Sequence, residues 1–253
     1  MRVFALSDIH VDYPVNARWV EDLSTFDYQD DLLILAGDVS DSLKRIEQCL
    51  KAFARRFSKV LFVPGNHELW VMRDPVETNS LVKFTDVCTV AEQAGASMRA
   101  FHRGSLSVVP LLGWYDFSFG LPGEYLRSAW MDFIACRWPA GWEAGDIAAY
   151  FLGRNDCTRV PVGRTTISFS HFLPRIDLMP SFIPAEDRAL YPVLGSARLD
   201  EQIRALGSTL HVYGHSHVNR RITIDGVTYV NNAFAYPHEN RLSSRSLLCL
   251  FEL

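Results

Sequence analysis

The chain has 253 residues and a mass of 28.7 kDa, a length at which one large domain and two small ones are both possible. Hydrophobic residues make up 48% of it and charged residues 21%, which is typical of a soluble globular protein and excludes a disordered or fibrous one. The formal net charge of −4 argues against a dedicated binder of long nucleic acids or of anionic membranes.

Three short apolar runs and one helical pattern open the chain. The runs Val3–Leu6, Leu32–Ala36 and Lys59–Val63 are predicted as strands that are buried on both faces. Between the second and third runs, apolar residues recur at spacings of three and four from Leu43 to Phe57, which predicts a helix. The order strand, helix, strand is typical of a parallel sheet.

The second half of the chain contains more strands and fewer clear helical patterns. The dipeptide Asp225-Gly226 predicts a tight hairpin between two of these strands. A parallel first half followed by a partly antiparallel second half predicts an α/β protein with two sheets packed face to face, helices outside, and one domain over residues 1–253. The predicted strands are Leu106–Leu112, Thr165–Ser170, Thr209–Tyr213, Arg221–Ile224, Val227–Asn231 and Ser246–Phe251.

A Trp-rich excursion from about residue 114 to residue 163 departs from this pattern. It holds four of the six tryptophans (Trp114, Trp130, Trp138 and Trp142) together with frequent glycine and proline. Two interpretations stay open. The segment packs onto the main core as an aromatic excursion, or it forms a cap over an active site, since long excursions often carry binding surfaces.

The sequence also predicts the compartment. No apolar run approaches the roughly 18 residues that a membrane span needs, and the first apolar stretch reaches Asp8 too early for a signal peptide. The five cysteines are odd in number and scattered, with no Cys-x-x-Cys pair, which favours reduced thiols over a disulfide framework or a zinc knuckle. We therefore expect a cytoplasmic protein with no membrane contact.

Potential metal ligands stand directly after five predicted strands. Because sites in α/β folds gather at the carboxyl ends of strands, we expect these residues to converge, although the first and last of them are 209 positions apart. Each motif alone occurs by chance in many proteins, whereas the ordered set does not. The motifs are Asp8-Ile9-His10, Gly37-Asp38, Gly65-Asn66-His67-Glu68, His171 and Gly214-His215-Ser216-His217.

The ligand types are mutually consistent. Two carboxylates, one amide oxygen and four imidazoles suit zinc, iron or manganese and disfavour calcium or copper(I). Seven ligands (Asp8, His10, Asp38, Asn66, His171, His215 and His217) exceed what one tetrahedral ion takes, but they suit two ions that share a carboxylate. Two ions about 3.5–4 Å apart form a clamp for phosphoryl chemistry.

The ordered motifs resemble the calcineurin-like metallophosphoesterases, in which Asp-x-His, Gly-Asp, Gly-Asn-His-(Asp or Glu), a lone His and Gly-His-x-His follow successive strands. All five blocks occur here in that order, over about residues 1–231. The resemblance implies a four-layer α/β/β/α sandwich of two mixed sheets flanked by helices. It also implies a dinuclear-metal-dependent hydrolase that acts on a small phosphate ester, as a phosphomonoesterase or a phosphodiesterase.

The resemblance further implies the role of each residue. The two ions would be divalent or mixed-valence manganese, iron or zinc, and a metal-bound hydroxide would attack phosphorus in line. Asp8, His10 and His217 would hold the first ion, Asn66, His171 and His215 the second, and the catalytic Asp38 would bridge them. His67 would protonate the leaving group or stabilise its charge. The alternative for His67 is a turn residue bonded to a neighbouring carbonyl.

Two departures from the Ser/Thr protein phosphatases of this superfamily bear on the substrate. Those enzymes carry Arg-Gly where this chain has Ser42-Leu43, and Arg where it has Pro64. Two guanidinium clamps for phosphate are therefore missing, which argues against protein phosphatase activity. Cyclic-nucleotide phosphodiesterases and the nucleases usually have Asp in place of Glu68.

Two alternatives to a small-substrate hydrolase remain. The first is a nuclease of the same superfamily, which would need a basic groove that the net charge disfavours. The second is a non-catalytic scaffold like the retromer subunit, which would not need the intact ligand set. Arg175, Arg220 and Arg221 are candidate substrate contacts or simple surface charges, and His102 and His211 are predicted to be structural.

Overall fold

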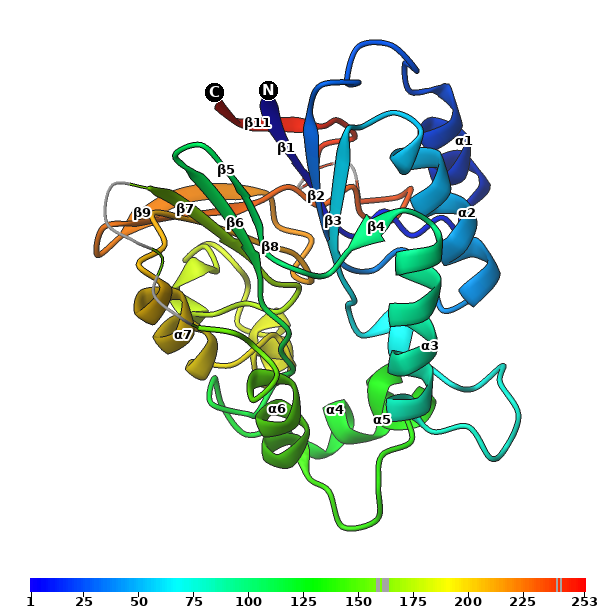
Figure 1. Cartoon of the computed structure of the whole chain (residues 1–253). Coiled ribbons are helices and arrows are strands. Elements are labelled where there is room, and N and C mark those ends of the chain that lie inside the picture. Colours follow the sequence, from blue (N-terminus) through cyan, green and yellow to red (C-terminus); the bar gives the residue numbers. More distant parts are fainter. Residues whose placement is uncertain (158–159, 161–163, 240, 242) are drawn as a thin grey trace.

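The structure is a computed structural model of the chain, and it describes residues 1–157, 160, 164–239, 241 and 243–253. Figure 1 shows two β-sheets packed against each other, with helices on their outer sides. The predicted α/β class and layer order are confirmed. Among the described residues, no helix is both long enough and apolar enough to cross a membrane.

The first sheet has five strands in the order β11-β1-β2-β3-β4. Strands β1 to β4 are parallel, as the predicted strand–helix–strand unit requires, and the C-terminal strand β11 pairs antiparallel with β1. The strands are β1 (Arg2–Leu6), β2 (Leu32–Ala36), β3 (Lys59–Val63), β4 (Ala96–Ser97) and β11 (Leu248–Glu252). Helices α1 (Pro14–Asp22), α2 (Leu43–Ala54) and α3 (Ser80–Gln93) cover the outer face of this sheet.

The second sheet has six strands in the order β5-β6-β7-β8-β10-β9. Its centre is parallel and its two edge strands are antiparallel. The strands are β5 (Phe101–Arg103), β6 (Leu106–Pro110), β7 (Thr165–Phe169), β8 (Leu210–Tyr213), β9 (Arg220–Ile224) and β10 (Val227–Asn231). Helices α6 (Ala144–Leu152) and α7 (Arg198–Leu206) pack on its outer face.

Alternating side chains build three hydrophobic layers. In β1, Val3 and Ala5 point between the two sheets, whereas Phe4 and Leu6 pack under the helices of the first sheet. Because strand side chains alternate between faces, a continuous apolar run buries both faces at once. This is the physical reason that the short apolar runs could be predicted as strands.

The predicted hairpin is present between β9 and β10. Ile224 pairs with Val227, and the two intervening residues, Asp225 and Gly226, have φ values of 48° and 84°. Positive φ at both central residues is the type I′ geometry, which matches the right-handed twist of the flanking strands. The sequence prediction of this turn is therefore confirmed in detail.

The Trp-rich excursion forms α4 (Glu124–Ala129), α5 (Met131–Ala135) and α6, and its residues 158–159 and 161–163 lie outside the described residues. Trp114 is 1% exposed, and its ring lies 5.1 Å from the ring of Trp138 and 5.0 Å from that of Phe172. The first interpretation, an aromatic segment packed onto the core, therefore describes this part of the excursion. The remaining short 3₁₀ helices are η1 (His67–Leu69), η2 (Ile176–Leu178) and η3 (Asp187–Val193).

Candidate metal centre and active site

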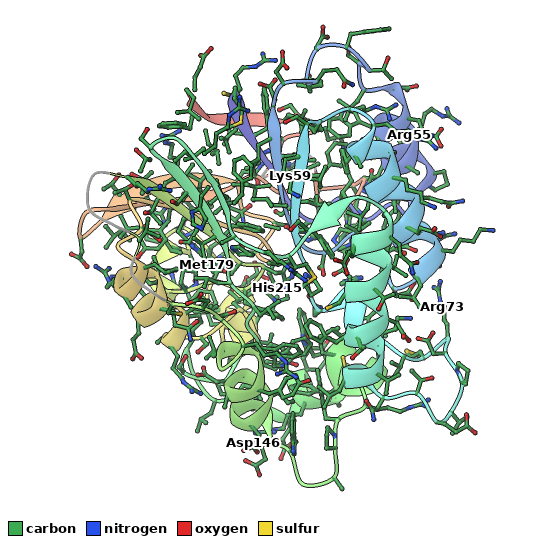
Figure 2. All side chains as sticks on the ribbon, viewed as in Figure 1. Arg55, Lys59, Arg73, Asp146, Met179 and His215 are labelled. Atoms are coloured by element: carbon green, nitrogen blue, oxygen red, sulfur yellow. The ribbon has the colours of Figure 1, made fainter. Side chains whose placement is uncertain are left out.

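The seven predicted ligands converge where β1, β2, β3, β7 and β8 end. Each ligand follows the C-terminal end of one of these strands, on the connection to the next element. His215, which follows the end of β8, accordingly lies near the middle of the molecule in Figure 2. Residues more than 200 positions apart therefore meet, as expected. They do so because all five strands have their carboxyl ends on the same side of the molecule.

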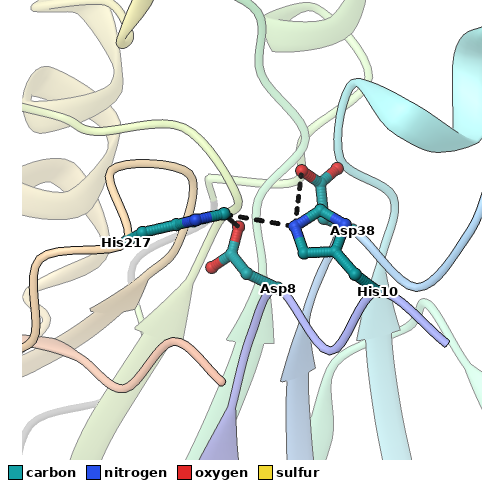
Figure 3. A group of neighbouring side chains, drawn as sticks. All are labelled: Asp8, His10, Asp38 and His217. Atoms are coloured by element: carbon teal, nitrogen blue, oxygen red, sulfur yellow. Dashed lines mark hydrogen bonds and ion pairs between the residues drawn. The ribbon is translucent and has the colours of Figure 1, made fainter. Parts of the chain in front are cut away.

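The first group of ligand atoms comes from Asp8, His10, Asp38 and His217 (Figure 3), and these atoms all lie within 4.8 Å of one another. The Nε2 atoms of His10 and His217 are 3.2 Å apart. The His217 Nε2 is 3.3 Å from Asp8 Oδ1, and the His10 Nε2 is 3.9 Å from Asp38 Oδ2. Three elements far apart in the sequence therefore point donor atoms at one small volume.

The second group comes from Asp38, His171 and His215, with Asn66 beside it. The His171 Nε2 lies 3.1 Å from His215 Nδ1, 3.1 Å from Asn66 Oδ1 and 3.5 Å from Asp38 Oδ1. Asp38 thus turns one carboxylate oxygen toward each group. It is the residue that the two groups share.

The spacing of these atoms suits metal coordination. Two ligands about 2.1 Å from one ion are roughly 3.0 Å apart at a right angle and roughly 3.4 Å apart in a tetrahedron. The separations of 3.1 to 3.3 Å between donor atoms in both groups fall in that range. Donors of this type, buried and aimed at one another, fit first-row divalent ions.

Two of the histidines are held in the tautomer that a ligand needs. The Nδ1 of His171 lies 2.9 Å from the carbonyl oxygen of Ala36, and the Nε2 of His215 lies 3.0 Å from that of Val193. A ring nitrogen that donates to a carbonyl leaves the other nitrogen unprotonated and free to bind a metal. In both rings that other nitrogen is the one that faces the second group.

His217 has a carboxylate partner where His171 and His215 have a backbone carbonyl. Its Nδ1 lies 2.6 Å from Glu239 Oε2, and its Nε2 faces Asp8. Although burial opposes the charged ring, the two carboxylates raise the pKa of His217 to about 10. A carboxylate behind a ligating imidazole orients the ring and makes it a stronger donor to a metal.

Five of the predicted ligands have a strained backbone. Residues other than glycine rarely adopt the left-handed region, and each instance costs on the order of 1–3 kcal/mol. The five have φ values between 42° and 66°, and they are Asp8, His10, Asp38, His215 and His217. Such strain, concentrated in the ligand loops, marks a functional site because the surrounding fold must supply the energy that holds it.

The glycines of the motifs leave room for the ligands. A Cβ on Gly37 would lie 2.5 Å from Nδ1 of His171, and one on Gly65 would collide with Oδ1 of Asp38. Gly37 also has a φ of 83°, which side chains disfavour. The Gly-Asp and Gly-Asn-His pairs therefore reflect close packing of the ligands against the neighbouring loops.

The comparisons with known proteins agree with this geometry. The sequence profile of the calcineurin-like phosphoesterases matches residues 1–219. The chain belongs to this family. It is therefore a metal-dependent hydrolase of phosphate esters, which confirms the reaction class predicted from the motifs.

One protein, PptH of Mycobacterium tuberculosis, is similar to nearly the whole chain both in sequence and in structure. The acyl-carrier-protein phosphodiesterase PptH of Mycobacterium tuberculosis is 26% identical over 268 residues, which span 94% of this chain and 79% of PptH. The crystal structure of the phosphopantetheinyl hydrolase PptH from the same organism superposes with a TM-score of 0.78 at 24% identity, and it covers 98% of this chain and 95% of the other. The calcineurin-like fold thus extends over the full length.

Glu68 is the last residue of the Gly-Asn-His-Glu block, and it braces two ligand loops of this phosphoesterase. Its fully buried carboxylate accepts backbone N–H groups from Gly65 at 2.6 Å, Val39 at 2.5 Å, Asp38 at 3.1 Å and Ser40 at 3.4 Å. It therefore ties the loop after β2 to the loop after β3. These loops carry Asp38 and Asn66, so Glu68 supports the metal groups without joining them.

His67 is half-buried and faces the carboxylate that the two groups share. Its Nε2 lies 3.8 Å from Asp38 Oδ2 and 3.4 Å from the hydroxyl of Tyr236, and its ring stacks on Trp70 with a centroid distance of 3.7 Å. Burial lowers the pKa of His67 to about 3, with a further contribution from the neighbouring histidines. The ring is neutral near pH 7, so it can donate or accept a hydrogen bond there but is not an imidazolium acid.

Sequence reasoning missed five residues of the site: Trp70, Trp130, Asp132, Tyr236 and Glu239. Tyr236 stacks on His10 with a centroid distance of 4.5 Å, and Trp130 lies edge-on to His215 at 6.0 Å. None of the five belongs to a spaced motif. The signals that the sequence does contain are the density of tryptophan in the excursion and the position of the segment after β10, which follows a long strand near the predicted site.

The other candidate residues lie outside the two groups. The guanidinium of Arg175 pairs with Asp177, Asp200 and Asp225, and that of Arg220 donates to the Leu178 carbonyl at 2.6 Å. His102 is exposed on β5, and Arg221 is exposed on β9.

His211 is fully buried in β8, where its ring nitrogens contact the hydroxyls of Ser168 at 2.9 Å and Ser170 at 3.1 Å. This histidine is structural, as predicted.

Proposed function

We propose that this chain is a phosphodiesterase that releases the phosphopantetheine arm from an acyl carrier protein. The observation that carries the proposal is the sequence similarity to PptH over 94% of this chain and 79% of PptH, combined with the presence of all seven candidate ligands.

The metal ligands are part of this proposal. Asp8, His10 and His217 would hold one ion, Asn66, His171 and His215 the other, and Asp38 both, with manganese, iron or zinc as the candidate metals. Bound divalent ions supply Lewis-acid activation of water and neutralise phosphate charge. The protein supplies the orientation of the donors and their burial.

His67 and Tyr236 lie where a leaving group would depart. Both side chains are half-buried. The His67 Nε2 lies 3.8 Å from Asp38 Oδ2, and the Tyr236 hydroxyl is 3.4 Å from that ring nitrogen. A serine alkoxide leaves with developing negative charge, and a neutral imidazole N–H that donates to this oxygen lowers the barrier. Tyr236, stacked on His10, orients the imidazole for this contact.

Replacement of His67 by alanine is expected to slow an alkyl phosphodiester by about 10²-fold and a p-nitrophenyl phosphodiester by less than about tenfold. The reason is that p-nitrophenolate departs without help, whereas an alkoxide needs a hydrogen-bond donor. A series of diesters with graded leaving-group pKa values checks this through the slope of log kcat against that pKa. His102→Ala, a histidine remote from the site, is the matched control. Equal losses across the series would contradict the role of His67.

The substrate is tested by incubating metal-loaded protein with a phosphopantetheinylated acyl carrier protein. We expect mass spectrometry to show the carrier returning to its unmodified serine form, with free phosphopantetheine in solution. Bis-p-nitrophenyl phosphate, p-nitrophenyl phosphate and single- or double-stranded DNA form the other arms. An intact carrier beside rapid cleavage of a small ester would instead support the small substrate predicted from the sequence, and cleaved DNA would support a nuclease.

We also propose that residues 1–253 form one domain, because segments near both ends of the chain pair with each other. The C-terminal strand β11 completes the first sheet beside β1. The bridge between Ser7 and Ala233 links the two ends of the chain a second time. Limited proteolysis that released two stable fragments would contradict this organisation.

A further inference from the structure

The excursion places one carboxylate behind the metal groups. Asp132 lies in the first turn of α5 and is only 2% exposed. Its Oδ1 accepts hydrogen bonds from Asn66 Nδ2 at 2.8 Å and from Trp70 Nε1 at 2.7 Å, and its Oδ2 accepts one from Trp130 Nε1 at 2.8 Å. All three partners can act only as donors at these atoms, so the carboxylate is a buried acceptor with three fixed N–H groups.

The contact with Asn66 decides which way its amide points. The NH₂ end is bound to Asp132, so the oxygen end faces His171 Nε2 at 3.1 Å, inside the second ligand group. In the flipped orientation, the amide oxygen would lie against the carboxylate, and the NH₂ group, which has no lone pair for a metal, would face the ligands. The negative charge of Asp132 therefore selects the ligating orientation of Asn66.

The same carboxylate also fixes two indoles that line the site. The ring of Trp70 stacks on His67 at 3.7 Å, and the ring of Trp130 lies edge-on to His215 at 6.0 Å. Both indole N–H groups donate to Asp132, so neither ring can rotate without breaking a part-buried hydrogen bond to this carboxylate. The side chain of Asp132 thus contacts a proposed metal ligand, Asn66, and also both indole rings that pack against His67 and His215.

We propose that Asp132 is a positioning residue that completes the second metal site by holding Asn66 in its ligating orientation, and that the Trp-rich excursion is for this reason part of the active site. The proposal rests on the two-ion centre of the proposed function. Neither sequence interpretation included this role. In the proposal, the excursion does not cover the site as a cap but orients Asn66 through a side chain that lies outside the two ligand groups.

An exchange of the two side chains tests the proposal. D132N removes the charge that selects the orientation, and binding of the second Mn²⁺ is expected to weaken by about 10- to 100-fold, with the first Mn²⁺ unchanged. N66D alone places two carboxylates in contact and is also expected to weaken the second ion. The double variant D132N/N66D is combined with Trp70→Phe, because the Trp70 N–H donates to the same Asp132 oxygen as Asn66. The amide introduced at position 132 then donates to the carboxylate introduced at position 66. The other oxygen of that carboxylate faces the second group, so most of the lost affinity returns.

The readout is isothermal titration calorimetry with Mn²⁺ alone on the full chain, supported by the electron paramagnetic resonance signal of the coupled ion pair. Asp116→Asn is the matched control, because this carboxylate lies in the same excursion but accepts from Ser196 Oγ at 2.7 Å and belongs to neither ligand group. It should leave both affinities unchanged. If Asp132 were only structural, D132N would lower the stability of the fold. The effect of N66D on the affinity for the second Mn²⁺ would then be the same with Asp or Asn at position 132.

Two results would overturn the proposal: unchanged second-ion affinity in folded D132N, or an N66D effect of the same sign and size in both backgrounds. Should D132N fail to fold, Trp70→Phe and Trp130→Phe each remove one donor without a change of charge. Both should then lower the second affinity by a smaller factor, and unchanged affinity in both would count against the proposal. A wild-type protein that binds two Mn²⁺ but leaves the carrier intact would contradict the proposed function only.

Discussion

Replacing Asp38 with alanine is expected to lower kcat for bis-p-nitrophenyl phosphate by about 10³-fold or more. Asp38 is the one carboxylate shared by both ligand groups, with its oxygens 3.9 Å from His10 Nε2 and 3.5 Å from His171 Nε2. The metal clamp in such sites contributes several kcal/mol of charge stabilisation in the transition state, and each 1.36 kcal/mol corresponds to a factor of ten in rate. Loss of the shared ligand removes the clamp as a unit.

The measurement is steady-state hydrolysis after reconstitution with Mn²⁺, with metal content determined on the same samples. His171→Ala should behave like Asp38→Ala, because its ring nitrogen lies 3.1 Å from both His215 and Asn66 in the second group. Asp86→Ala, an exposed carboxylate on α3, should keep full activity. Circular dichroism should show that the variants are folded. Turnover within tenfold of wild type in both ligand variants would refute the proposed site.

Replacing Glu68 with alanine is expected to lower the free energy of unfolding by at least about 3 kcal/mol. The side chain is fully buried, and its carboxylate accepts close hydrogen bonds from the backbone N–H groups of Val39, Gly65 and Asp38. Each buried donor left without a partner costs about 1–3 kcal/mol. The ligand loops after β2 and β3 would also separate, so metal affinity should fall together with stability.

Urea denaturation of metal-free protein isolates the structural part of this effect. Glu47→Ala is the matched control, because Glu47 forms a surface ion pair with Lys51 on α2. A pair of this kind contributes less than about 0.5 kcal/mol. A Glu68→Ala variant that unfolds within about 1 kcal/mol of wild type would show that solvent replaces the carboxylate and that the brace is dispensable.

The fold could be predicted where a local pattern reports directly on burial. Leu32–Ala36 is buried at every position, and a continuous apolar run of five residues followed by glycine is typical of a strand buried on both faces. The Asp225-Gly226 turn could be predicted because the positive φ at both positions restricts the residues that fit. Helices α1, α3, α6 and α7 were not predicted, because helices in globular proteins depend on packing against a sheet more than on their own propensity.

Some residues of the candidate site could likewise be predicted from the sequence, and others could not. Residues that sit at strand ends with fixed spacing, such as Asp8 and His217, carry their own signal. Glu239 does not, because its role behind His217 depends on the 2.6 Å contact that the chain after β10 creates. The small substrate predicted from the net charge stays a prediction, and the similar protein PptH is named for an acyl carrier protein.

The sequence by itself determined the family, the reaction class and the seven candidate ligands, because coordination chemistry restricts which side chains can stand at successive strand ends. Only the tertiary structure decided how those ligands are held. Asp132 is 66 positions from Asn66, and the amide it orients has two ends that look alike in a sequence. The orientation of a ligand depends on a partner brought near by folding, and no spacing along the chain records that contact.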